Sequence, residues 1–373
     1  MRLFFILLAL TGLKVLAEVK PEVRPHMQEF YNITSQIQPY LLNKADYMNS
    51  KNEAEIAKAL VEFKQKTLQL KMDKMAQSDD MKFRARQLSE GLDEAEQSFK
   101  NGFKDYSYWV LKSSFNNCFT CHTQKGLGET GLKFTRNQKA SDFANAEFLF
   151  IVRNYSESIP LFEKIVVGYP DNKASVEELE SSLQKILYYS VRVLRDDKKT
   201  EELFERLLKN NQLPSTVRND VLSWQSYLKI KKYRVVENKE VKDESTLEQF
   251  LKERSDVAGH YKLGRQKYIV DLETSHTLFQ LLEKPSKNDL KPWILLGLSE
   301  IEKDYRTSMF DLSVEQYLKE CIEIYPKSPA AKKCLTLFKE IKKDAYTGSR
   351  GTDLPKSVID MINKYEKLIN NKK

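Results

Sequence analysis

The chain has 373 residues, with 61 Lys and Arg against 53 Asp and Glu, and only 12 Gly and 11 Pro. This length exceeds what one hydrophobic core usually serves, so we expect two or more domains. The basic residues are scattered among acidic ones, so the net charge of +8 does not indicate a nucleic-acid-binding surface. The helical spacing of the apolar residues predicts an all-α protein.

Residues 1–17 are expected to be a cleavable secretory signal peptide. They begin with a basic residue, Arg2, continue with an apolar run and end at Ala17, where we expect cleavage. The run is too short for a stable membrane span, and we expect no membrane insertion after cleavage. A bacterial periplasm is the simplest location for such an exported chain, and an uncleaved N-terminal anchor is the alternative.

Residues 18–130 are expected to form a domain of four helices joined by short polar links. The first helix should start near Pro25 and kink or end at Pro39. We expect the following side chains to face inward, in helix order: Met27, Phe30, Ile33 and Ile37; Ile56, Leu60, Phe63 and Leu70; Met81, Ala85, Leu88, Leu92, Ala95 and Phe99; Phe103, Tyr106, Val110, Ser114, Asn117 and Cys121.

The fourth helix carries Cys118-Phe119-Thr120-Cys121-His122, the Cys-x-x-Cys-His pattern of c-type haem attachment. Two thiols one helical turn apart can each add to one vinyl group of a single porphyrin, and His122 can then bind the iron as the proximal ligand. We therefore expect one haem c, held covalently by Cys118 and Cys121. A zinc site, which needs further ligands, a thioredoxin-like redox site and a plain disulfide are the other readings.

The end of the fourth helix is polar, because it carries two pairs of adjacent polar residues, Ser113-Ser114 and Asn116-Asn117. An apolar seam between helices should not tolerate these side chains, whereas a helix packed on a planar cofactor should. The pattern therefore favours a haem lying against this end of the helix. Export agrees with this interpretation, because c-type haem is attached on the outer side of an energy-transducing membrane.

A four-helix bundle with this motif near the end of its last helix resembles the cytochrome c-prime and cytochrome c-556 family. The resemblance covers roughly residues 20–130 and rests on the motif and its position. It implies a sixth iron ligand from a Met on the first helix in one branch, and a five-coordinate iron in the other. Met27, and after it His26, are the candidates here, and no protein ligand is the third option. The resemblance also implies a possible homodimer, while the family's Arg four residues after the His is replaced by Gly126.

Residues 131–140 lack a helical period and are expected to be a linker. Residues 141–373 then resemble tetratricopeptide repeats, with small residues where paired helices touch, an aromatic residue on the second helix and a Pro after it. The matching positions are Ala146, Phe150, Tyr155, Ser158, Phe162, Ile165 and Pro170, and more loosely Trp293, Leu296, Gly297, Leu318, Cys321 and Pro326. A generic α-helical domain is the alternative.

Further helices are expected at 174–194, 198–209, 214–231, 245–254, 265–283 and 355–370. The last of these helices should cap the stack, and its side chains that face inward should be Val358, Met361, Ile362 and Leu368. Cys321 and Cys334 fall on two successive helices, where they form either a disulfide or two buried thiols.

These features predict an exported mono-haem c-type cytochrome that transfers electrons and docks a protein partner through its helical repeats. A haem sensor of nitric oxide or carbon monoxide and a haem-less exported scaffold are the alternatives. We expect no enzyme, because the sequence has no P-loop, Gly-x-Ser-x-Gly, His-Glu-x-x-His or dinucleotide motif. A peroxidase-like activity would need a distal His and Arg pair that the sequence does not assign.

Overall fold

A computed structural model describes residues 24–72, 79–124, 134–229, 241–259, 267–282, 289–303, 313–349 and 351–370, at some helix ends through the backbone alone. Within these ranges the regular structure is helical apart from one short hairpin, β1 (Thr347–Gly348) with β2 (Gly351–Thr352). The fold class is therefore all-α, as predicted. No helix in the described ranges is both long and apolar enough to cross a membrane.

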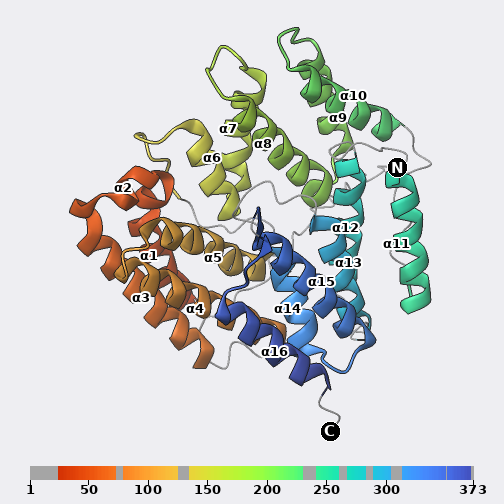
Figure 1. Ribbon diagram of the computed structural model, residues 1–373. Helices are drawn as coiled ribbons and strands as arrows, with labels where there is room; N and C mark the ends of the chain where they lie inside the picture. Colours follow the sequence, from red (N-terminus) through yellow and green to blue (C-terminus); the bar gives the residue numbers. More distant parts are fainter. Residues whose placement is uncertain are drawn as a thin grey trace, which may run out of the picture.

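Four long helices pack side by side at the start of the chain (Figure 1). They are α1 (Arg24–Leu42), α3 (Glu53–Met72), α4 (Asp79–Lys100) and α5 (Lys104–Gln124), with the short α2 (Lys44–Met48) and η1 (Ser50–Asn52) between the first two. Each is amphipathic and turns its apolar stripe to the others, because that is where the stripe leaves water. Ile37, Leu60, Leu92 and Leu111, one from each helix, have no exposed surface. We call residues 24–124 the N-terminal unit.

The predicted stripes of α1, α3 and α4 are confirmed wherever their side chains are described, apart from the half-buried Ala85. The buried members are Phe30, Ile33, Ile37, Ile56, Leu60, Phe63, Leu88, Leu92, Ala95 and Phe99. Pro39 does not end α1, because the helix continues through it to Leu42, and the alternative of a kink at Pro39 stays a prediction. Pro39 lies in the last turn, where its missing N–H removes only one helical hydrogen bond.

The predicted stripe of α5 is wrong at its beginning, because Phe103 and Tyr106 are exposed. Phe103 precedes the helix, and its backbone N–H bonds to the carbonyl of Ser98, so its side chain does not follow the helical period of α5. The buried residues of α5 are Ser107, Tyr108, Leu111, Ser113, Ser114 and Phe115.

The remaining helices follow α5 in chain order, and those with a predicted range match it within about three residues, except that the helix expected at 245–254 extends to Gly259. They are α6 (Asp142–Ile151), α7 (Tyr155–Val167), α8 (Val176–Leu187), the π-helix η2 (Tyr188–Leu194), α9 (Asp197–Leu208), α10 (Ser215–Lys229), α11 (Glu244–Gly259), α12 (Tyr268–Leu282), α13 (Lys291–Glu302), α14 (Ser313–Ile324), α15 (Pro329–Ala345) and α16 (Lys356–Asn370). In the pair α6–α7 the fully buried Ser158 donates a hydrogen bond of 2.8 Å to the carbonyl of Ala146. Two small residues therefore meet where these helices touch.

The apolar core passes from the N-terminal unit into α6 without a break. Phe134 is buried, and its ring centroid lies 4.9 Å from that of Tyr31 on α1 and 5.4 Å from that of Phe148 on α6. A second apolar cluster joins α11 to α16. The division into two domains at residues 131–140 stays a prediction.

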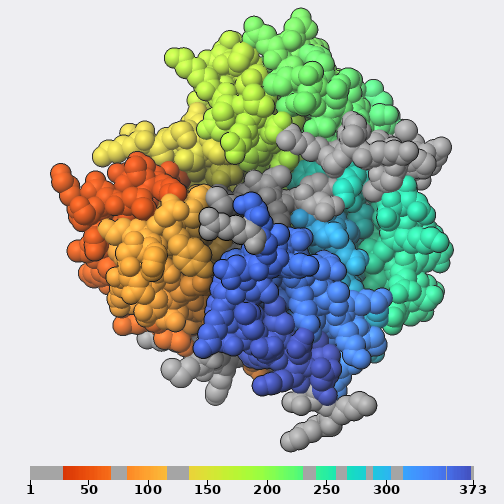
Figure 2. All heavy atoms as spheres, viewed as in Figure 1, coloured from red at the N-terminus to blue at the C-terminus, as the bar shows by residue number. Residues whose placement is uncertain are grey.

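The end of the chain returns to its beginning. From α6 onward the helices lead around the molecule, and α14, α15 and α16 lie directly beside the N-terminal unit (Figures 1 and 2). Arg84 of α4 forms an ion pair of 2.9 Å with Glu320 of α14, and Arg86 pairs with Glu323. We call α14, α15 and α16 the C-terminal unit.

The C-terminal unit is held together by covalent and apolar contacts. Cys321 and Cys334 form a disulfide between α14 and α15, with Cα atoms 6.5 Å apart. On α16, Val358 is buried as predicted, but Leu368 is exposed and Tyr365 is buried in its place. Tyr365 takes the inward position because its ring packs on α15 and its hydroxyl donates to Glu323 of α14 at 2.7 Å.

Candidate functional site

Cys118, Cys121 and His122 lie in the last two turns of α5. The structure describes their backbone, and their side chains lie outside the described part. Positions three and four residues apart share one face of a helix, so these three fall within about 100° around its axis. The same face, followed back along α5, carries the buried residues Ser107, Leu111, Ser114 and Phe115. The motif therefore continues the inward face of the helix.

The register between α4 and α5 shows what lies level with the motif. The two helices run antiparallel and in close contact, and the hydroxyl of Ser107 donates to the carbonyl of Ala95 at 2.6 Å. Further along, Gly91 faces Ser114. In this antiparallel register, each step toward the end of α5 corresponds to one step toward the start of α4. Counted from the contact between Gly91 and Ser114, Cys118 and Cys121 therefore lie level with residues 87 and 84 of α4.

The start of α1 lies at this same end of the N-terminal unit. Near the other end, the Tyr108 hydroxyl donates to the Leu41 carbonyl at 2.9 Å. In the middle, the ring of Phe63 on α3 lies between those of Phe115 and Phe30, with centroids 5.4 and 5.6 Å away. Because α1 runs antiparallel to α5, its first turns come level with the motif.

Both candidates for a sixth iron ligand, His26 and Met27, belong to those first turns of α1. The structure thus brings the helical segments of all five predicted site residues to one end of the N-terminal unit. Their side chains are outside the described residues, so the ligand itself stays a prediction.

The polar end of α5 needs no cofactor to explain its two serines. Ser113 and Ser114 are buried, and each donates a hydrogen bond of 2.8 Å to the carbonyl of Val110. Ser114 also packs on Gly91, where a larger pair of side chains would not fit. The expectation that a seam between helices does not tolerate these two serines is therefore wrong, because helix packing satisfies both hydroxyls. Asn116 and Asn117 lie outside the described side chains.

Arg84 is a buried charge at this end that the sequence analysis missed. Its side chain is 1% exposed and that of its partner, Glu320, is 3% exposed. The signal was present in the sequence, because Arg84 stands four residues before Leu88 and eight before Leu92, in the apolar stripe of α4. A charge in such a stripe needs a buried partner.

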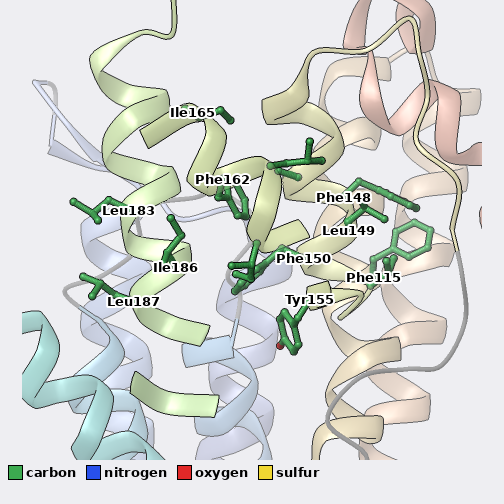
Figure 3. Close-up of a cluster of buried hydrophobic side chains, with 14 of the residues drawn as sticks. Phe115, Phe148, Leu149, Phe150, Tyr155, Phe162, Ile165, Leu183, Ile186 and Leu187 are labelled. Atoms are coloured by element: carbon green, nitrogen blue, oxygen red, sulfur yellow. The ribbon is translucent and has the colours of Figure 1, made fainter. Parts of the chain in front are cut away.

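A cavity of about 120 Å³ lies between α1, α5 and α6. Its lining includes Leu41, Lys112, Phe115, Glu147 and Phe148, and Figure 3 shows Phe115 next to the aromatic and aliphatic side chains of α6. Burial lowers the pKa of Lys112 to about 8, against the opposing attraction of Glu147. Lys112 therefore places an amine of lowered basicity in this cavity, six residues before Cys118 on α5.

Among the described residues, no three His, Cys, Asp or Glu side chains gather as they would around a metal ion. Comparison of the chain with protein-family models, with curated proteins and with solved structures gave no match.

Proposed function

We propose that the protein is an exported mono-haem c-type cytochrome that transfers electrons. In this proposal Cys118 and Cys121 hold the haem through thioether bonds, and His122 is the proximal ligand of the iron. The observation that carries it is the position of the motif on the inward face of α5, at the end of four packed helices.

The donor set fits the group. Two thiols and an imidazole on one helical face are what covalent attachment and axial ligation require, and the haem supplies one-electron redox chemistry when bound. The chain's own residues bind and orient it. Leu88, Leu111 and Phe115 are buried in the apolar core of the N-terminal unit, and this core would exclude water from the inner side of the group.

Within the same proposal, the N-terminal unit is a haem-binding four-helix bundle of the cytochrome c-prime and c-556 kind. The candidates for a sixth ligand are Met27, and after it His26, at the start of α1, with no protein ligand as the third option. The later helices form a tetratricopeptide-like stack that docks a protein partner. The meeting of Ser158 and Ala146 between α6 and α7 supports this, because repeat helices approach closely at small residues.

The test is expression of the full chain in a periplasm that attaches c-type haem, followed by intact mass and a pyridine haemochrome spectrum. We expect one haem per chain that survives acid–acetone extraction, and loss of residues 1–17. The matched control is Cys118→Ser with Cys121→Ser, which should be colourless but helical by circular dichroism. A colourless wild-type protein, with both thiols free or joined to each other, would overturn the proposal.

A further inference from the structure

We propose that Glu320 is a positioning residue for the haem site, acting through Arg84. It holds the Arg84 guanidinium beside the end of α5 that carries the motif, and it offsets that charge. The C-terminal unit thereby lowers the reduction potential of the haem. This inference rests on the function proposed above and assigns a role to the ion pair between the two units.

The position of Arg84 is fixed by the packing of α4 on α5. Seven residues, close to two full turns, separate it from Gly91, so both residues lie on the same side of α4. That side faces α5, because Gly91 contacts Ser114. By the antiparallel register, Arg84 comes level with Cys121.

The pairing of Arg84 with Glu320 is deeply buried. The Nη2 atom of Arg84 lies 2.9 Å from Oε2 of Glu320, and the side chains are 1% and 3% exposed. Water screens such charges poorly, so each acts on other charges at the same end of the unit more strongly than a surface pair would. A haem iron gains a positive charge on oxidation, so a nearby cation raises its reduction potential and a nearby anion lowers it.

The neighbouring ion pair provides a built-in control. Arg86 pairs with Glu323, which also accepts from Tyr365, across the same contact between α4 and α14. Arg86 lies about 140° around α4 from Gly91, on the side away from α5, and its side chain is 37% exposed. Loss of this pair weakens the same contact without changing the charge beside α5.

The experiment measures the midpoint potential of the full-length holoprotein for the wild type, Glu320→Gln, Glu323→Gln and the double variant Arg84→Gln with Glu320→Gln. Glu320→Gln keeps the shape of the side chain and removes the negative charge facing Arg84, so we expect a rise in potential. Glu323→Gln should leave the potential unchanged. The double variant removes both charges and should return toward the wild-type value. Where Glu320→Gln alone fails to fold, Arg84→Gln takes its place: it removes the positive charge and leaves that of Glu320, so the potential should fall, and an unchanged potential would overturn the inference.

Unfolding in urea is followed in parallel, because a purely structural role would lower stability and leave the potential unmoved. Equal shifts in Glu320→Gln and Glu323→Gln, or no shift in either, would overturn the inference while the coloured protein upholds the proposed function. A colourless wild type would instead remove the proposed function itself, and this inference with it.

Discussion

A Cβ atom on Gly91 of α4 would overlap the hydroxyl of Ser114 on α5. The two helices can approach this closely only because one residue has no side chain and the other a small one. Gly91→Ala should therefore destabilise the protein. Overpacking costs about 1–3 kcal/mol and the better helix propensity of Ala returns about 1 kcal/mol, so we expect a net loss of up to about 2 kcal/mol in urea unfolding.

Two further variants test the cause of this loss. Adding Ser114→Ala removes the hydroxyl oxygen, which is the nearest atom, and should restore part of the stability. Gln97→Ala changes an exposed residue of α4 and should have little effect. If Gly91→Ala stabilises the protein as any Gly→Ala change in an exposed helix would, the helices do not pack as described.

The contact between Gly91 and Ser114 also shows what the sequence can and cannot predict. The apolar stripes of α1, α3 and α4 follow from helical periodicity alone, because burial of a stripe needs no knowledge of its partner. Tertiary choices do not follow in this way. The sequence suggested a cofactor against Ser114, whereas a glycine 23 positions earlier in the chain explains that serine.

The same distinction between local and tertiary features applies to the candidate site. The motif itself is local, and its place on α5 could be predicted from its spacing. Arg84 was missed because its partner, Glu320, is 236 residues away and comes beside it only through the return of α14 to the N-terminal unit. Likewise the burial of Tyr365 rather than Leu368 depends on Glu323 of another helix.

The sixth iron ligand is testable by spectroscopy. If Met27 binds the iron from the start of α1, the reduced holoprotein should show a sharp low-spin spectrum that does not change under carbon monoxide. Met27→Ala should open the position and give a carbon monoxide spectrum, because an apolar side chain cannot ligate. Met48→Ala, at a partly exposed position on α2, is the matched control and should behave as wild type. A wild-type protein that binds the gas at once would instead favour the sensor.

The disulfide between Cys321 and Cys334 should contribute to stability without contributing to the haem. The two residues are 13 positions apart. Closing a loop of that size reduces the conformational entropy of the unfolded chain and so raises its free energy by about 3 kcal/mol. Cys321→Ser with Cys334→Ser should therefore lower the free energy of unfolding by about that amount. Dithiothreitol should have the same effect on the wild type and none on the double variant.

The thioether bonds proposed at Cys118 and Cys121 are not reducible, so the haem should remain attached throughout. Release of haem by the reductant would contradict thioether attachment.

Lys112 should make stability depend on pH above neutrality. Burial lowers its pKa from 10.5 to about 8 in the folded protein. Between these values the unfolded chain binds more protons, so stability rises with pH across this window, and below pH 8 the full cost of the buried ammonium remains. Lys112→Met should thus be more stable than the wild type at pH 7, by on the order of 1–3 kcal/mol, and the difference should shrink as pH approaches 10.

Lys58→Met, at a position 76% exposed on α3, is the control and should follow the wild type at every pH. A constant difference between Lys112→Met and the wild type from pH 7 to 10 would mean that the amine is not desolvated in its cavity.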